Sequence, residues 1–350
     1  MSDTGPILEF LTVFANCRSL DQLISAFEQL ATRLLPCQDV RLLVGPDEPQ
    51  TEYPLQIPLT SADGMTVGHV IASCDPVSDS GRAAEALALV AAMALRRAQL
   101  MRLAREREVL LGEVALARQI LMEMLPRGPL TAGSFAISGR LQAADRLGGD
   151  CFGYTRSSPG QVSLLLADAV GHGLGSTLLV SECRAIWRAI SRGSGTLSER
   201  VGLLNRLLAE NTGPERFVAA CPAILDCQTG TLELISCGLA PHLMYRARTD
   251  AVELLEEAEP PLGIFTDYSF QSQQCVLAPG DLFLAVSDGV LEWVGPDSEL
   301  FGEERLVEVL HEAIRVGSDP LSSLFQALRD FSRESVQRDD ACALLVRHAA

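Results

Sequence analysis

The stretch of residues 82–126 constrains the fold of this chain most, because it contains no proline until Pro126 ends it. Steps of alternately three and four residues through it fall on apolar side chains, except at Arg96 and Arg107. This spacing is the pattern of a long helix with one apolar seam. At 1.5 Å of rise per residue, such a helix would extend roughly 65 Å. The sequence therefore predicts a helical linker with a separate domain on each side.

Two interpretations of the seam stay open. The helix either packs along its own chain, or it pairs with a second copy and transmits a signal between the flanking domains. The two seam arginines would weaken a plain zipper, and Gly112 is a point where the helix could bend. The positions expected to form the regulatory seam of a homodimer are Leu103, Leu110, Val114 and Leu121.

The segment before the linker, residues 1–81, has the pattern of a small α+β domain. Apolar residues with helical spacing come first and continue to Leu34. Strand-like runs follow at 40–44, 53–59 and 67–73, separated by turn residues. In this order of elements the segment resembles a compact GAF-like sensory domain, but no ligand-binding residue carries over.

The segment after the linker, residues 127–350, groups its strands together and inserts its helices in pairs. Such grouping favours an α+β fold, with sheets covered by helices, over repeated βαβ units. The expected strands are 135–141, 162–166, 217–225, 231–236 and 283–286, and the expected helices are 175–191, 198–210, 303–316 and 320–334.

Composition excludes several classes of function. There are 45 acidic and 28 basic residues, and the net charge of −17 argues against a broad nucleic-acid footprint. Every basic residue is arginine, so the lysine that a P-loop NTPase, a protein kinase or a Schiff-base enzyme needs is absent. We expect neither a secretion signal nor a membrane span, which takes about 20 apolar residues. The ten cysteines form no CxxC pair, so we expect reduced thiols and a cytoplasmic protein.

Four aspartates stand at the ends of apolar strands or beside glycines. They are Asp150 after two glycines, Asp168 after a leucine run, Asp288 before Gly289, and Asp339 before a final apolar run. A strand that ends in this way projects a carboxylate from a rigid sheet edge, where glycine permits close approach. Taken singly, each pattern is also what an ordinary turn produces.

If the four carboxylates converge, cations must offset their mutual repulsion. Oxygen-only ligands suit Mg²⁺ or Mn²⁺. Two such ions roughly 3.5–4 Å apart can activate a water molecule and bind a phosphoryl oxygen. The sequence by itself does not show the convergence.

Seven short motifs occur in order in the region 118–348. They are Gly148-Gly149-Asp150, Ala167-Asp168-Ala169-Val170-Gly171-His172-Gly173, Pro261-Leu262-Gly263, Pro279-Gly280-Asp281, Ser287-Asp288-Gly289-Val290-Leu291-Glu292, Phe301-Gly302 and Arg338-Asp339-Asp340. This series is similar to the bacterial PPM phosphatases of the SpoIIE/RsbU type, which are metal-dependent serine/threonine phosphatases. The segment 115–126 also resembles the linker that precedes the domain in that family. The resemblance implies an α-β-β-α sandwich of two packed antiparallel sheets flanked by helices.

The resemblance also assigns roles to individual residues. Asp168 is implied to bridge two Mn²⁺ or Mg²⁺ ions, with Asp150 and the carbonyl of Ala169 on one ion, and Asp288 and Asp339 on the other. The residues implied to lie around these ligands are Asp340, as a support for Asp339 or for bound water, and Gly289 and His172. The histidine either donates a proton or binds phosphate, or it caps the following helix. The histidines at 69, 242, 311 and 348 are expected to be structural.

Three positions depart from the family pattern. Gly153 stands where a second aspartate is common, Leu239 stands where histidine is common, and Ser287 replaces a threonine. None of them removes an expected metal ligand. The loss of the histidine puts local substrate contacts in doubt more than it affects the metal centre.

The order of sensor-like domain, heptad helix and phosphatase implies a regulated enzyme. In the family the usual substrate is a phosphoserine or phosphothreonine on a small anti-sigma-factor antagonist of the STAS type, within partner-switching signalling. We expect the same substrate class here and a homodimer through the linker helix. The alternatives are a non-catalytic module of the same fold that binds a phosphoprotein, and a phosphatase for a small metabolite.

Overall fold

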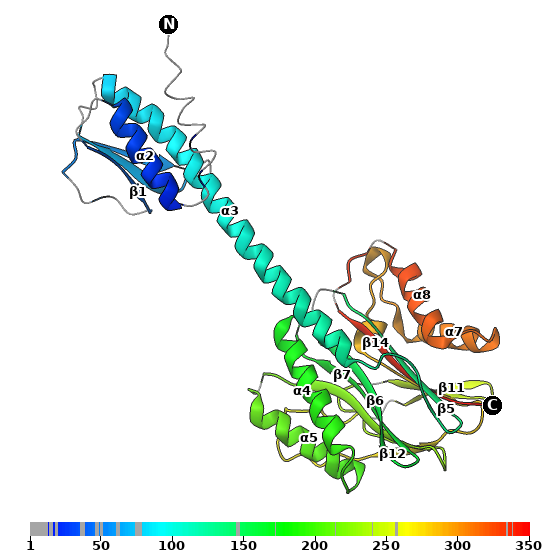
Figure 1. Ribbon diagram of the computed structural model, residues 1–350. Helices are drawn as coiled ribbons and strands as arrows, with labels where there is room; N and C mark the ends of the chain where they lie inside the picture. Colours follow the sequence, from blue (N-terminus) through cyan, green and yellow to red (C-terminus); the bar gives the residue numbers. More distant parts are fainter. Residues whose placement is uncertain are drawn as a thin grey trace. The chain divides into compact units, whose positions relative to one another are not determined.

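The computed structural model describes residues 13, 17, 20–35, 39–45, 49, 52–60, 64–73, 79–144, 148–171, 173–213, 215–239, 241–255, 258–333, 335–337 and 339–350, with the backbone alone at 20, 34 and 79–86. The chain divides into two compact units, Met1–Gly112 and Glu113–Ala350 (Figure 1). Within the described ranges, no helix has both the length and the apolar character needed to cross a membrane.

The first unit packs helices against one antiparallel sheet with the strand order β1-β3-β2. Its elements are α2 (Leu20–Leu34), β1 (Val40–Val44), β2 (Leu55–Thr60) and β3 (Thr66–Ala72). Leu23, Phe27 and Ala31 recur every four residues on α2, and all three are buried. They share a core with Leu95 of the long helix α3 (Asp79–Met124). The three strands are confirmed to within two residues, and the GAF-like assignment stays a prediction.

Helix α3 confirms the long helix expected from the missing prolines, since it ends two residues before Pro126. All side chains from Leu100 to Leu110 are exposed, including the apolar ones on the seam. Leu103 is 59% exposed and Leu110 is 61% exposed. Val114 is partly buried, and Leu121 is only 6% exposed. Of these four seam positions, the two in the middle of the helix are therefore the exposed ones.

The second unit contains two antiparallel sheets. The six-stranded sheet, in the order β11-β10-β13-β14-β5-β4, consists of β4 (Leu130–Ala132), β5 (Phe135–Gln142), β10 (His242–Arg246), β11 (Ala251–Leu255), β13 (Leu282–Val286) and β14 (Ala341–His348). The five-stranded sheet, in the order β12-β9-β8-β7-β6, consists of β6 (Asp150–Ser158), β7 (Gln161–Ala169), β8 (Val218–Asp226), β9 (Thr231–Leu234) and β12 (Gln273–Val276).

The two sheets pack face to face around one apolar core. On β13, Phe283 and Ala285 join the core that also holds Leu164 and Leu166 of β7. The alternate residue Leu284 belongs to a second core on the other face of the six-stranded sheet. This alternation follows from the two-residue period of a strand. Both faces of β13 are covered, which is why its sequence is apolar throughout.

Helices cover the outer face of each sheet (Figure 1). The helices are α4 (Leu174–Ile190) and α5 (Leu197–Asn211) on the five-stranded sheet, and α7 (Gly302–Arg315) and α8 (Pro320–Ser332) on the six-stranded sheet, with short α6 (Asp288–Leu291) and the 3₁₀ turn η1 (Pro296–Ser298) between β13 and α7. Thr196 and Glu199 form a capping box at the start of α5, and Asp319 caps α8. The expected α-β-β-α sandwich is confirmed.

Candidate functional site

Asp150 and Asp168 face each other across two neighbouring strands. Asp150 is the first residue of β6, and the antiparallel register places it directly opposite Asp168 of β7. Side chains at such paired positions have Cβ atoms about 5 Å apart. The ladder continues past the pair, because the Ala169 amide donates to the Gly149 carbonyl at 3.0 Å. A Cβ atom on Gly149 would lie 2.6 Å from the Ala169 carbonyl oxygen, so this approach requires glycine.

Asp288 and Asp339 come from the other sheet. Asp288 opens α6 directly after β13, and Asp339 lies two residues before β14. These two strands pair with each other, and the pairing extends to a hydrogen bond of 2.9 Å from the Ser287 amide to the Cys342 carbonyl. The fold therefore brings Asp288 and Asp339 to one end of the six-stranded sheet.

Ser287 joins the two pairs of aspartates. Its hydroxyl donates to Oδ2 of Asp150 at 2.6 Å and accepts a hydrogen bond from the Cys342 amide at 3.0 Å. Ser287 and Asp150 are both buried, so this bond is shielded from water. It connects the five-stranded sheet directly to the end of β13 in the six-stranded sheet.

Asp150, Asp168, Asp288 and Asp339 together form what we call the aspartate junction, where their negative charges repel one another. Burial and the neighbouring Asp168 raise the pKa of Asp150 well above its usual range, although the Ser287 hydrogen bond acts in the opposite direction. Burial, and then the charge of Asp288, raise the pKa of Asp168 to about 7. Burial is also the main reason why the pKa of Asp339 is raised. A nearby positive charge would relieve this repulsion.

The donor chemistry of the junction fits a hard divalent cation. All the candidate side-chain ligands are carboxylate oxygens, which suit Mg²⁺ or Mn²⁺. Oδ1 of Asp150 is buried and lacks a hydrogen-bond partner among the described residues. In that same part of the chain, no three acidic, histidine or cysteine side chains meet closely enough to hold one ion. The carboxylates instead turn to hydrogen-bond donors, as Asp150 does to Ser287 and Asp339 does to the Asp340 amide at 2.8 Å.

Asp340 holds the loops of the junction together. Its Oδ1 accepts a hydrogen bond from the Ala144 amide at 2.9 Å. A Cβ atom on Gly148 would lie 1.5 Å from its Oδ2, and one on Gly289 would lie 1.8 Å from its carbonyl oxygen. The glycines beside two of the aspartates therefore make room for Asp340. These contacts give Gly148 and Gly289 a steric role, whereas the support of Asp339 or bound water by Asp340 stays a prediction.

Thr177 makes hydrogen bonds near the aspartates that the sequence analysis did not predict. Its hydroxyl lies 2.8 Å from the Gly148 carbonyl and 2.9 Å from the Gly173 carbonyl. It thereby connects the first turn of α4 to the segment that precedes Asp150. The only available signal was a threonine one turn after a glycine-rich loop, which is common at helix starts.

His172 and Arg338 lie outside the described residues.

The comparison with known families decides the assignment. The family model described as Stage II sporulation protein E (SpoIIE) matches residues 158–349, which is more than half of the chain. The chain belongs to the SpoIIE family. The match covers Asp168, Asp288 and Asp339, whereas Asp150 lies just before it.

Individual relatives agree with this assignment. Phosphoserine phosphatase RsbP of Bacillus subtilis is 24% identical over 238 residues, which cover 67% of this chain and 57% of that protein. Phosphoserine phosphatase RsbU of the same organism is 24% identical over 198 residues, which cover 54% of this chain and 59% of that protein. The chain thus spans less than two thirds of the length of either relative.

A solved structure establishes the fold of the SpoIIE-family domain. The SiaA-PP2C domain of Pseudomonas aeruginosa superposes with a TM-score of 0.59 at 20% identity, over 70% of this chain and 98% of that domain. The two-sheet sandwich therefore has the PP2C fold.

The three departures from the family pattern have different structural consequences. Ser287 keeps the hydroxyl that reaches Asp150. Leu239 is buried, and its carbonyl accepts a hydrogen bond from Ser236. His242, also buried, contacts Ser236 at 3.1 Å, and burial lowers its pKa to about 4, which fits a structural histidine. Gly153 lies on β6 opposite Leu165, and a Cβ atom there would be 3.3 Å from Nε of Arg184.

Proposed function

We propose that the SpoIIE-family domain of this chain is a metal-dependent phosphatase that hydrolyses phosphoserine or phosphothreonine on a protein. The observation that carries the proposal is the buried hydrogen bond from Ser287 to Asp150. It joins aspartates from two different sheets into one acidic junction. The relatives RsbP and RsbU, both named phosphoserine phosphatases, support the choice of substrate.

Two divalent cations, Mg²⁺ or Mn²⁺, fit the donor set of the junction. Asp150, Asp168 and the carbonyl of Ala169 would hold one ion, and Asp168, Asp288 and Asp339 would hold the other. When bound, such ions make water nucleophilic near neutral pH and offset the negative charge of the phosphoryl group. They would also favour the ionised form of Asp168, whose pKa is otherwise about 7.

The protein itself contributes the positions of the ligands. The Ser287 hydroxyl fixes one oxygen of Asp150 and leaves Oδ1 without a partner among the described residues. The Asp340 amide fixes one oxygen of Asp339. Cys151, next to Asp150, is fully buried, and burial raises its pKa to about 12. It stays a thiol at neutral pH, so the proposed reaction uses water rather than a cysteine nucleophile.

The proposed substrate is a phosphorylated anti-sigma-factor antagonist of the STAS type, acting in partner-switching signalling. The similarity to RsbP and RsbU supports this substrate class. We further propose that two copies pair through the exposed apolar residues in the middle of α3. Leu103 and Leu110 would lie in that interface, because each exposes more than half of its surface. A signal received by the first unit would then alter the packing of α3 and, through it, the geometry of the aspartates.

The test is phosphate release from a phosphoserine peptide in EDTA, in Mg²⁺ and in Mn²⁺. The full chain is compared with Asp168→Asn and Asp288→Asn. We expect metal-dependent turnover in the wild type and a loss of about 100-fold or more in both variants, since each removes a ligand of the proposed centre. The absence of turnover with either metal, together with binding of the peptide, would contradict the proposal and favour a non-catalytic binding module.

A further inference from the structure

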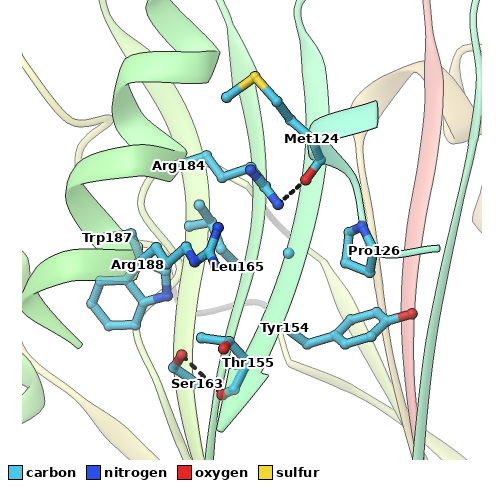
Figure 2. A pocket seen from close by; sticks show the side chains of 10 residues that line it. Met124, Pro126, Tyr154, Thr155, Ser163, Leu165, Arg184, Trp187 and Arg188 are labelled. Carbon is cyan, nitrogen blue, oxygen red and sulfur yellow. Dashed lines mark hydrogen bonds between the residues drawn. The ribbon is translucent and has the colours of Figure 1, made fainter. Parts of the chain in front are cut away.

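A cavity of about 230 Å³ lies between the last turn of α3 and the surface formed by β6, β7 and α4 (Figure 2). Met124 and Pro126 line it on one side, Leu165 of β7 forms part of its floor, and α4 contributes Arg184, Trp187 and Arg188. All of these residues belong to the second unit. Gly153 is three residues along β6 from Asp150, roughly 10 Å at the rise of a strand, so the cavity is separate from the aspartate junction.

The charged side chains that line the cavity are both arginines, and the neutral hydroxyls of Tyr154, Thr155 and Ser163 line it as well. Arg184 and Arg188 are one helical turn apart on α4, and Figure 2 shows both guanidinium groups at the cavity. Among the described residues that line it, none is acidic. Burial lowers the pKa of Arg184, and the neighbouring charge of Arg188 acts in the same direction. Two adjacent arginines without a carboxylate are notable in a chain whose net charge is −17.

Two donor atoms at this cavity have no acceptor among the residues that the structure describes. Arg184 donates through one terminal nitrogen to the Met124 carbonyl, but its Nε is buried and has no partner within the described part of the chain. The same holds for Nε1 of Trp187, a residue that is only 3% exposed. A buried donor that lacks an acceptor costs about 1–3 kcal/mol. A ligand with acceptor atoms would offset part of that cost.

Gly153 leaves the space beside Arg184 open. It lies in the middle of β6, and the nearest atom to a Cβ built on it is Nε of Arg184, at 3.3 Å. Any side chain at this position would enter the cavity next to the guanidinium group. Because position 153 is a glycine, the space beside Arg184 stays free and its guanidinium group stays accessible to a ligand.

We propose that this cavity binds a small organic anion, a carboxylate or phosphate with an apolar body. The anionic group would pair with Arg184 and Arg188, and the apolar part would lie against Leu165 and Pro126. At about 30 Å³ for each water molecule, the cavity has the volume of roughly eight waters, which suits an ion as large as benzoate. Pairing with two guanidinium groups gives charge-assisted hydrogen bonds, which are among the stronger ones in proteins.

The experiment is calorimetric titration of the full chain, kept in EDTA so that the aspartate junction repels anions. The probes are benzoate, phenylphosphonate, sulfate and the neutral analogue benzamide. We expect saturable binding of benzoate, phenylphosphonate or both, weaker binding of sulfate, and none of benzamide. Benzoate and phenylphosphonate distinguish the carboxylate from the phosphate type. Binding of benzamide as tight as that of benzoate, or no saturable binding of either aryl anion, would overturn the proposal.

Two matched pairs of variants locate the site. Arg188→Glu should weaken binding by about tenfold or more, the effect of losing one charge-assisted hydrogen bond. Arg192→Glu makes the same charge change just beyond α4, at an exposed residue that does not line the cavity, and should change binding less than about twofold. Equal effects of the two variants would mean that the anion responds only to general charge.

The second pair is Gly153→Asp and Gly153→Asn, which differ only in charge. The aspartate would place its own carboxylate beside Arg184 and should abolish binding of the aryl anions. The asparagine fills the same volume without the charge and should weaken binding less than the aspartate does. If both variants bind benzoate as the wild type does, the ligand does not occupy this cavity. Circular dichroism of each variant checks that the fold is retained.

Discussion

Replacing Asp168 by asparagine should stabilise the metal-free protein while it removes the proposed activity. In the native state, burial and the charge of Asp288 raise the pKa of Asp168 to about 7 from an ordinary value of 3.8. Between these pH values the native state keeps a proton that the unfolded chain has already released. The free energy of unfolding therefore falls as the pH rises from about 4 to 7. Asparagine carries no charge and avoids this loss.

The expected size of the effect follows from the shift in pKa. A difference of about 3 pKa units, at 1.36 kcal/mol for each unit, amounts to roughly 4 kcal/mol at pH 8. Asp168 is partly accessible to solvent, so we expect about 2–4 kcal/mol after screening. For a unit of this size each kcal/mol shifts the melting temperature by about 2–4 °C, so the variant should melt about 4–16 °C higher.

The assay is thermal unfolding of the full chain at pH 8 and at pH 4.5, with EDTA and with Mn²⁺. The difference between Asp168→Asn and the wild type should nearly vanish at pH 4.5, where the wild-type carboxyl is already neutral. Mn²⁺ should raise the melting temperature of the wild type and have little effect on the variant, since a ligand stabilises only the state that binds it.

A control aspartate separates this effect from a general response to lower negative charge. Asp226 accepts hydrogen bonds from the Thr229 and Gln228 amides, which lower its pKa. Asp226→Asn should therefore not stabilise the protein at pH 8. The reasoning is refuted if Asp168→Asn melts at or below the wild type at pH 8 in EDTA, or if its advantage is the same at pH 4.5.

Variants at Ser287, at Gly289 and at the seam pair Leu103 and Leu110 test other parts of the site and the linker. Ser287→Ala removes the hydroxyl that joins the two sheets and should lower kcat in the phosphopeptide assay about 10-fold or more. Ser287→Thr keeps the hydroxyl and should retain most of the rate. Equal rates of the two variants would contradict the role of the bond. Gly289→Ala places a Cβ atom 1.8 Å from a backbone oxygen, so we expect a loss of about 2 kcal/mol or more in urea unfolding, and wild-type stability would show that the loop simply shifts. The double variant Leu103→Asp with Leu110→Asp should make the chain monomeric in sedimentation analysis at unchanged stability of the second unit, and a dimer that persists would exclude the α3 interface.

Much of the fold could be predicted from the sequence, because its signals are local. The apolar run of β7 and the missing prolines of α3 each depend on neighbouring residues alone, and both predictions were confirmed to within a few residues. Strand β6 was missed because glycine, arginine and serines interrupt its apolar residues. Its place in the sheet comes from pairing with β7, which supplies the regularity that its own sequence lacks.

The aspartates illustrate the limit of a sequence argument for the site. Their positions at strand ends were visible, but their meeting depends on contacts between residues far apart in the chain. The bond from Ser287 to Asp150 spans 137 positions, and the bond from the Ala144 amide to Asp340 spans 196. No local pattern encodes such contacts. The steric role of Gly148 toward Asp340 likewise became visible only in the folded chain.

The cavity beside Arg184 could not be predicted from the sequence for a similar reason. Two arginines one turn apart on a helix usually lie on a solvated face. Only the packing of α4 over β6 and β7 places them at a concave space, beside a tryptophan nitrogen that has no hydrogen-bond partner among the described residues. Gly153 was noticed as a departure from a family motif, but its effect on the volume beside Arg184 follows from the folded geometry.

The central claim is that the two sheets together build one cation centre. Its most direct test is the binding of Mn²⁺ to variants that each change one of the two sheets. Asp150→Asn changes only the five-stranded sheet, and Asp288→Asn changes only the end of β13 in the six-stranded sheet. If the two sheets build one cation centre, each variant should weaken Mn²⁺ binding, measured by calorimetry or electron paramagnetic resonance, by about tenfold or more. Binding that is lost in one variant and unchanged in the other would show that the aspartates do not act as one centre.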